Sequence, residues 1–80
     1  MSQPPDASAI VIDARGHRCP TPTLRLRRGL ERCAPGAIVE LWADDPLARI
    51  DVPHFVTQTG DELLALEMDG RTLRFRIRRR

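Results

Sequence analysis

Residues 62–78 read ELLALEMDGRTLRFRIR, and this stretch decides how the chain completes its fold. Strands are expected at 62–68 and 71–78, because they flank Asp69-Gly70, a pair typical of two-residue hairpin turns in which both central positions have positive φ. The second strand alternates strictly, so its two kinds of side chain face opposite sides of a sheet. The apolar side comprises Leu73, Phe75 and Ile77, and the basic side Arg74, Arg76 and Arg78.

Two strand–helix units are expected before this hairpin. Short β-branched runs predict the strands, and apolar residues at helical spacing predict a first helix that ends at Pro35-Gly36. A second helix follows Asp44-Asp45, with an irregular first turn because Pro53 lies inside it. The chain is therefore assigned to the α/β class, as a two-layer sandwich of order βαβαββ with two helices on one face of a four-stranded mixed sheet. The strands of these units are expected at 9–13 and 38–43. The first helix is expected at 20–33 and the regular part of the second at 52–59.

The 80 residues are enough for one domain, expected at 9–80, preceded by a flexible tail at 1–8. Hydrophobic residues make up 41% and charged residues 30%, which is typical of a folded chain. No apolar run approaches the roughly 20 residues that span a bilayer, and the N-terminus lacks the features of a signal peptide. We therefore expect a cytoplasmic protein that does not bind a membrane.

All thirteen basic residues are arginines, and six of them fall in the last ten positions. Arginine suits carboxylates and phosphates, so an acidic partner and a nucleic acid are both considered, beside the simpler interpretation of a solvated strand face. Direct nucleic-acid binding is disfavoured, because aromatic residues make up only 4%, Phe75 is expected to face inward, and Trp42 alone offers a stacking surface.

Cys19 is the candidate functional residue because it precedes Pro20 at the predicted start of the first helix. A proline disfavours helical geometry in the residue before it and is itself favoured at the first helical position, so Cys19 is expected to be the N-cap. Pro22 removes one of the amide donors that an N-cap side chain uses, and leaves the Thr21 N–H for the sulfur. This position predicts a partly exposed thiol whose pKa is lowered.

Arg15 and Arg18 precede Cys19 in the loop and are expected to favour its thiolate. Cys33 is expected to be buried on the apolar face of the first helix. A helix between the two cysteines would separate them by about 20 Å, too far for a disulfide. The other metal-ligating residues stand at no zinc-like spacing from Cys19, so we expect neither a metal nor another cofactor.

Residues 13–22, DARGHRCPTP, resemble the opening of the TusA/SirA-like sulfurtransferases. That family is marked by an aspartate, here Asp13, a glycine three residues on, here Gly16, and a Cys-Pro-x-Pro box at the start of a helix, here residues 19–22. The resemblance extends over residues 9–78. It includes the further stretches Pro35-Gly36, Ala43-Asp44-Asp45-Pro46, Asp51-Val52-Pro53 and the terminal hairpin.

The resemblance implies a sulfur carrier rather than a stand-alone enzyme. Cys19 would accept persulfide sulfur from a cysteine desulfurase or a rhodanese and pass it to a cysteine of an acceptor protein, in tRNA thiolation, cofactor synthesis or sulfur oxidation. No cofactor is implied beyond the covalent persulfide on Cys19. The residues around it, Asp13, Arg15, Gly16, Arg18, Pro20, Thr21 and Pro22, would support the site.

Several residues outside the box are candidate partner contacts. Leu24 falls on the exposed side of the first helix, and Asp44 and Asp45 end a strand, where we favour capping of the second helix. Arg74, Arg76 and Arg78 are the remaining candidates. Two alternatives stay open: a nucleic-acid-binding module that uses an arginine-rich open sheet face, since the fold resembles the C-terminal domain of translation initiation factor three, and a redox-regulatory thiol protein.

Overall fold

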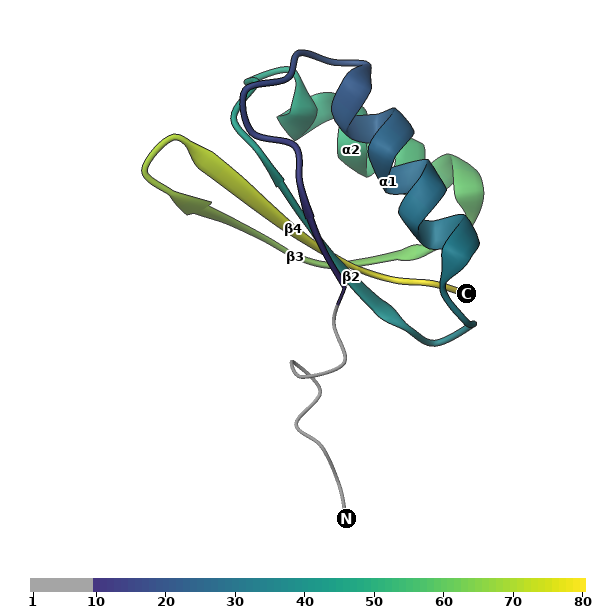
Figure 1. Ribbon diagram of the computed structural model, residues 1–80. Helices are drawn as coiled ribbons and strands as arrows, with labels where there is room; N and C mark the ends of the chain where they lie inside the picture. Colours follow the sequence, from purple (N-terminus) through teal and green to yellow (C-terminus); the bar gives the residue numbers. More distant parts are fainter. Residues whose placement is uncertain (1–9) are drawn as a thin grey trace.

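The computed structural model describes residues 10–80, in which the predicted order βαβαββ and the α/β class are confirmed (Figure 1). The predicted tail at 1–8 lies outside the described residues. No helix in the described part of the chain is long and apolar enough to cross a membrane. The elements are β1 (Ile10–Asp13), α1 (Thr21–Arg32), β2 (Ile38–Ala43), α2 (Ala48–Thr59), β3 (Glu62–Asp69) and β4 (Thr72–Arg78).

The sheet is mixed and has the strand order β1-β2-β4-β3. β1 and β2 are parallel, as a strand–helix–strand connection requires, whereas β4 pairs antiparallel with both β2 and β3. Both helices lie on the same face of this sheet, and the opposite face is open (Figure 1). β1 is an edge strand of the sheet, because it pairs only with β2 within the described residues.

The core lies between the helices and the covered face of the sheet. The predicted alternation of β4 is confirmed, because Leu73, Phe75 and Ile77 are buried while the arginines between them face the open side. From the helices, Leu26 and Leu30 of α1 pack into the same core. The buried positions of α2 are Ala48, Val52 and Val56.

The second helix follows Asp44-Asp45 as predicted, but the expected irregular first turn is wrong, because α2 is regular from Ala48 and continues through Pro53. A proline inside a helix lacks the N–H that would donate to the carbonyl four positions earlier, here that of Arg49, and its ring crowds that carbonyl. The first turn is closed without that bond: the Ala48 N–H donates to the Asp45 carbonyl (2.9 Å) and the Asp51 N–H to the Leu47 carbonyl (2.9 Å). This regular first turn places Asp51 close to the site described next.

The predicted hairpin turn is shifted by one residue. Asp69 pairs with Thr72, so the two turn residues are Gly70 and Arg71. Among them only Gly70 has a positive φ, 63°. A glycine with positive φ at the first central position is the pattern of a type II′ turn, which, unlike type I′, lets the second position be an ordinary residue such as arginine.

Candidate functional site

Cys19 lies in the loop between β1 and α1, and the prediction that it caps α1 is wrong. The helix begins at Thr21 with Pro20 as its N-cap, and the Cys19–Pro20 peptide bond is cis. The Thr21 N–H, expected to serve the sulfur, donates instead to the Arg18 carbonyl (2.9 Å). The loop thus makes one further turn before the helix, and that turn uses the amide that would have favoured a thiolate.

Two carboxylates hold the main chain of this loop. Asp44 accepts a hydrogen bond from the Gly16 N–H (2.9 Å), and Asp45 accepts one from the Cys19 N–H (2.8 Å). The second oxygen of Asp45 accepts from the Leu47 N–H (3.0 Å), and these two amide bonds lower the pKa of Asp45. The prediction that the pair caps α2 is wrong for Asp44. On the α2 side, Asp45 binds only the turn that precedes the helix, through the Leu47 N–H. Leu47 itself is the N-cap of α2, and no side chain forms a capping hydrogen bond there.

The Cys19 thiol is half-buried, and the prediction of a lowered pKa is wrong. Burial, a hydrogen bond to the Asp51 carboxylate and the negative charges of Asp51 and Asp45 raise the pKa of Cys19 from 9.0 to about 11. All three influences disfavour a thiolate, because an apolar setting penalises any charge and a neighbouring anion penalises a further negative charge. The sulfur therefore sits in an acidic setting rather than at a positive helix end.

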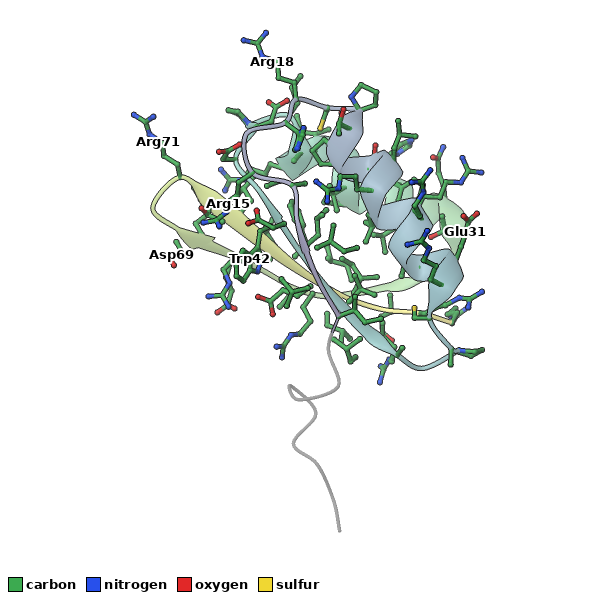
Figure 2. All side chains as sticks on the ribbon, viewed as in Figure 1. Arg15, Arg18, Glu31, Trp42, Asp69 and Arg71 are labelled. Atoms are coloured by element: carbon green, nitrogen blue, oxygen red, sulfur yellow. The ribbon has the colours of Figure 1, made fainter. Side chains whose placement is uncertain are left out.

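Neither loop arginine is among the groups that shift the pKa of Cys19, although the charge of Arg18 contributes to the lowered pKa of Asp45. Arg15 binds Asp13 through two bonds, Nε to Oδ1 (2.9 Å) and Nη2 to Oδ2 (2.7 Å), and its guanidinium lies 5.1 Å from the centroid of the Trp42 ring. The hydrogen bonds from Arg15 lower the pKa of Asp13 to about 2. Arg18 is exposed and extends away from the molecule, as Figure 2 shows. Asp13 and Arg15 thus brace the end of β1.

The remaining residues of the box shape the first turn of α1. Pro22 is buried, and the Pro20 carbonyl accepts hydrogen bonds from the Thr23 hydroxyl (2.7 Å) and the Leu24 N–H (3.0 Å). Leu24 is 57% exposed, which agrees with its predicted place on the outer side of the helix. The turn is therefore well anchored and presents one apolar side chain to the surroundings.

Cys33 differs from Cys19 in its burial and in its hydrogen-bond partner. It is buried at the C-terminal end of α1, as predicted, and its thiol donates to the Leu30 carbonyl (3.3 Å). Both cysteines are free thiols. The described residues contain no group of three or more histidine, cysteine or acidic side chains placed to hold a metal ion.

The arginines of β4 lie on the open face, where carboxylates of the same chain bind them. Glu40 is only 8% exposed and accepts bonds from the Trp42 indole (2.7 Å), from Arg74 (2.9 Å) and from Arg76 (3.3 Å). The indole bond, followed by the arginines, lowers the pKa of Glu40. Arg78 pairs with Glu62 (2.7 Å). A docking role for these arginines stays a prediction.

Asp51 is the site residue that the sequence analysis assigned no role. It stands in the stretch Asp51-Val52-Pro53, which contributed to the family resemblance, but 32 positions beyond Cys19 in the chain. Only the packing of α2 beside the cysteine loop brings the carboxylate to the sulfur. A signal was available, since an acidic residue in the first turn of a helix often has a local role there.

The fold and this loop define a class: a small two-layer α/β protein that holds one half-buried thiol at the end of its sheet. The profile of the sulfurtransferase TusA family matches residues 10–79, and the chain belongs to this family. A crystal structure of a SirA-like protein from Desulfitobacterium hafniense is similar, with a TM-score of 0.76 and 28% sequence identity. The match covers 86% of this chain and 95% of that one. The predicted family and, at that general level, a role in sulfur transfer are confirmed.

Proposed function

We propose that Cys19 carries sulfur as a persulfide between two partner proteins. Membership of a sulfurtransferase family supports a sulfur-transfer role, and Cys19 is the half-buried one of the two cysteines. The observation that carries the proposal is the clamp on its main chain, in which the Asp45 carboxylate binds the Cys19 N–H at 2.8 Å. A clamped loop presents the sulfur at a defined place where a donor and later an acceptor can reach it in turn.

The proposed transfer conserves atoms and electrons. The Cys19 thiolate attacks the terminal sulfur of a donor persulfide, so that a new S–S bond forms on Cys19 while the S–S bond of the donor breaks. The donor leaves as a thiolate, which takes up the proton given up by Cys19. In the second step, an acceptor thiolate attacks the terminal sulfur of the Cys19 persulfide, and Cys19 returns to its starting state. Neither step needs an external oxidant or reductant.

The raised pKa of Cys19 makes the free protein a poor nucleophile. With a pKa of about 11, only on the order of one thiol in ten thousand is ionised at neutral pH. The two carboxylates that hold the proton, Asp45 and Asp51, are also groups that a basic side chain of a partner can neutralise. We therefore assign thiolate formation to the docked state, in which a partner lysine or arginine offsets these charges.

Two alternatives receive less support. A redox-regulatory thiol needs thiolate character in the free protein, which the acidic setting of Cys19 opposes. A nucleic-acid surface on the open sheet face needs accessible cations, whereas Arg74 binds Glu40 and Arg78 binds Glu62. The identities of the donor and the acceptor, and a cytoplasmic location, remain predictions.

Sulfur loading tests the proposal directly. The protein is incubated with a cysteine desulfurase and cysteine, and its intact mass is measured under non-reducing conditions. The expected product carries one additional sulfur that a reductant removes; Cys19→Ser abolishes it and Cys33→Ala does not. A folded wild-type protein that gains no sulfur from several desulfurases and rhodaneses would contradict the proposal.

A further inference from the structure

A groove runs between the free edge of the sheet and the first helix, and neither cysteine lines it. We call it the β1–α1 groove; its volume is about 600 Å³. Its apolar lining comes from Ile10 and Ile12 of β1 and from Leu24 of α1. Gly29 lets the two walls approach, because a Cβ there would lie 2.4 Å from the Ile12 side chain.

Within residues 10–80, the strand wall of this groove has a main-chain edge to which no other strand is paired. β1 pairs only with β2, and the Ala14 N–H donates to the Trp42 carbonyl (2.8 Å). Because pairing alternates along a strand, the main-chain groups of Val11 and Asp13 point to the outer edge. The Asp13 carbonyl indeed accepts a bond from the Arg25 guanidinium of α1 (3.1 Å). The outer edge at Val11 is thus open to an additional strand.

The helix wall carries a row of positive charge. Arg25, Arg28 and Arg32 line the groove from α1, and none of the acidic side chains that the structure describes lines it. In the described part of the chain, Arg28 and Arg32 form no ion pair, in contrast to Arg27, which approaches Glu31 at 3.9 Å. An open strand edge, an apolar lining and unpaired guanidinium groups therefore occur together.

We propose that the β1–α1 groove binds an extended segment of a partner protein whose groove-facing side chains, which are every second residue, include both acidic and apolar ones. The segment adds to the sheet as a fifth strand at β1, and on the side facing α1 it places apolar side chains over Ile10 and Ile12 and carboxylates against Arg28 and Arg32. A second copy of this chain is the poorer occupant, since pairing two β1 edges would bring two rows of arginines together.

The position of the groove suggests what such a segment does. Thr21 lines the groove at the start of α1, two residues after Cys19. A bound segment therefore holds its protein next to the thiol without touching it and raises the effective concentration of the attached domain there. The binding itself does not depend on sulfur transfer.

Fluorescence anisotropy tests the proposal with a labelled octapeptide in which every second residue is serine and the residues between are alternately valine and glutamate, so that both kinds of side chain lie on one side of the strand. The full chain carrying Cys19→Ser is used, so that the outcome is independent of the thiol. The glutamate peptide is expected to bind, with an affinity that falls with added salt, and the same peptide with lysine in place of glutamate is expected not to bind. The double variant Arg28→Glu, Arg32→Glu should lose at least about tenfold in affinity, whereas Arg49→Glu, Arg71→Glu, with the same change in charge, should keep it.

The strand pairing is tested separately from the charges. Val11→Pro removes an outward N–H and is tolerable on an edge strand, and it should abolish binding that Val11→Ala retains. The same peptide N-methylated at every residue, which has no N–H group left to donate at either edge, should fail to bind the unaltered chain. Equal affinity for the acidic and basic peptides, or full binding by the Arg28, Arg32 variant, would overturn the proposal. So would binding that appears only after deletion of residues 1–8, which would make the chain's own N-terminal segment the occupant.

Discussion

This protein has one acidic centre on the open face of the sheet and another beside Cys19, and the two affect different properties of the protein. Glu40 on the open face is surrounded by donors from Trp42, Arg74 and Arg76, and its pKa is lowered. Asp45 and Asp51 lie beside the Cys19 thiol, where their charges keep a proton on the sulfur. A carboxylate that meets guanidinium groups stabilises the fold, whereas a carboxylate that meets a thiol controls its reactivity.

The pH dependence of Cys19 alkylation is expected to show the largest effect. Since the pKa is raised from 9.0 to about 11, the rate should climb with pH along a curve displaced to the alkaline side of a free cysteine. At neutral pH the thiolate fraction is then about a hundredfold below that of an unperturbed thiol. Iodoacetamide labelling of the Cys33→Ala protein, followed by mass spectrometry, measures the curve. A midpoint at or below 9.0 would remove the distinction between the two acidic centres.

Removal of the charge at Glu40 should mainly affect stability. Glu40→Gln removes the carboxylate that Arg74 and Arg76 share, and the free energy of unfolding should fall by about 2 kcal/mol at neutral pH. Because the folded pKa of Glu40 is depressed, this contribution exists above its unfolded pKa and is lost as the pH falls through the folded pKa. The difference from wild type, measured by urea unfolding, should therefore shrink in acid.

The matched control for that variant is Glu62→Gln. Glu62 and its partner Arg78 are both about half exposed, and such surface pairs contribute less than about 1 kcal/mol. Equal losses for the two variants would mean that burial of Glu40 adds nothing to its pairing.

The corresponding change at the cysteine loop, Asp51→Asn, should affect reactivity instead. Loss of this charge lowers the pKa of Cys19 and increases the thiolate fraction at neutral pH. Because a less basic thiolate is also a weaker nucleophile, the net increase in alkylation rate should be roughly tenfold. Asp69→Asn, at the far hairpin, serves as the control and should leave the rate unchanged. An unchanged rate in Asp51→Asn would show that burial and the charge of Asp45, rather than Asp51, raise the pKa of Cys19.

Cys33→Ala should have the smallest effect. Only a small buried group is lost from the end of α1, so the free energy of unfolding should decrease by about 1 kcal/mol, with sulfur loading on Cys19 intact. In the native wild-type protein, Cys33 should resist labelling under conditions that modify Cys19. Rapid modification of Cys33 would show that this end of α1 opens readily.

Patterns that repeat along the chain predicted the fold well. The alternation in β4 identified both faces of the sheet, and the spacing of Leu26 and Leu30 identified the buried side of α1, because burial imposes those periods directly. Local rules failed where a neighbouring segment intervened. The rule for a residue before proline predicted Cys19 as the N-cap. In the structure the Thr21 N–H donates to the Arg18 carbonyl instead, and Pro20 is the N-cap. Asp51 reaches the sulfur through tertiary packing, which no spacing along the chain encodes.

The clamp on the Cys19 main chain has a consequence for how a loaded carrier is told from an empty one. The sulfur sits on a fixed loop, not on a swinging arm, so its reach is set by covalent length alone. Under the proposed function, loading extends the side chain by one S–S bond, about 2 Å, and moves the reactive atom outward from a half-buried position. An acceptor whose cysteine stops short of the bare thiol by that distance would engage only the loaded form. The depth at which the loop holds Cys19 thus determines whether an acceptor can distinguish the loaded form from the empty one.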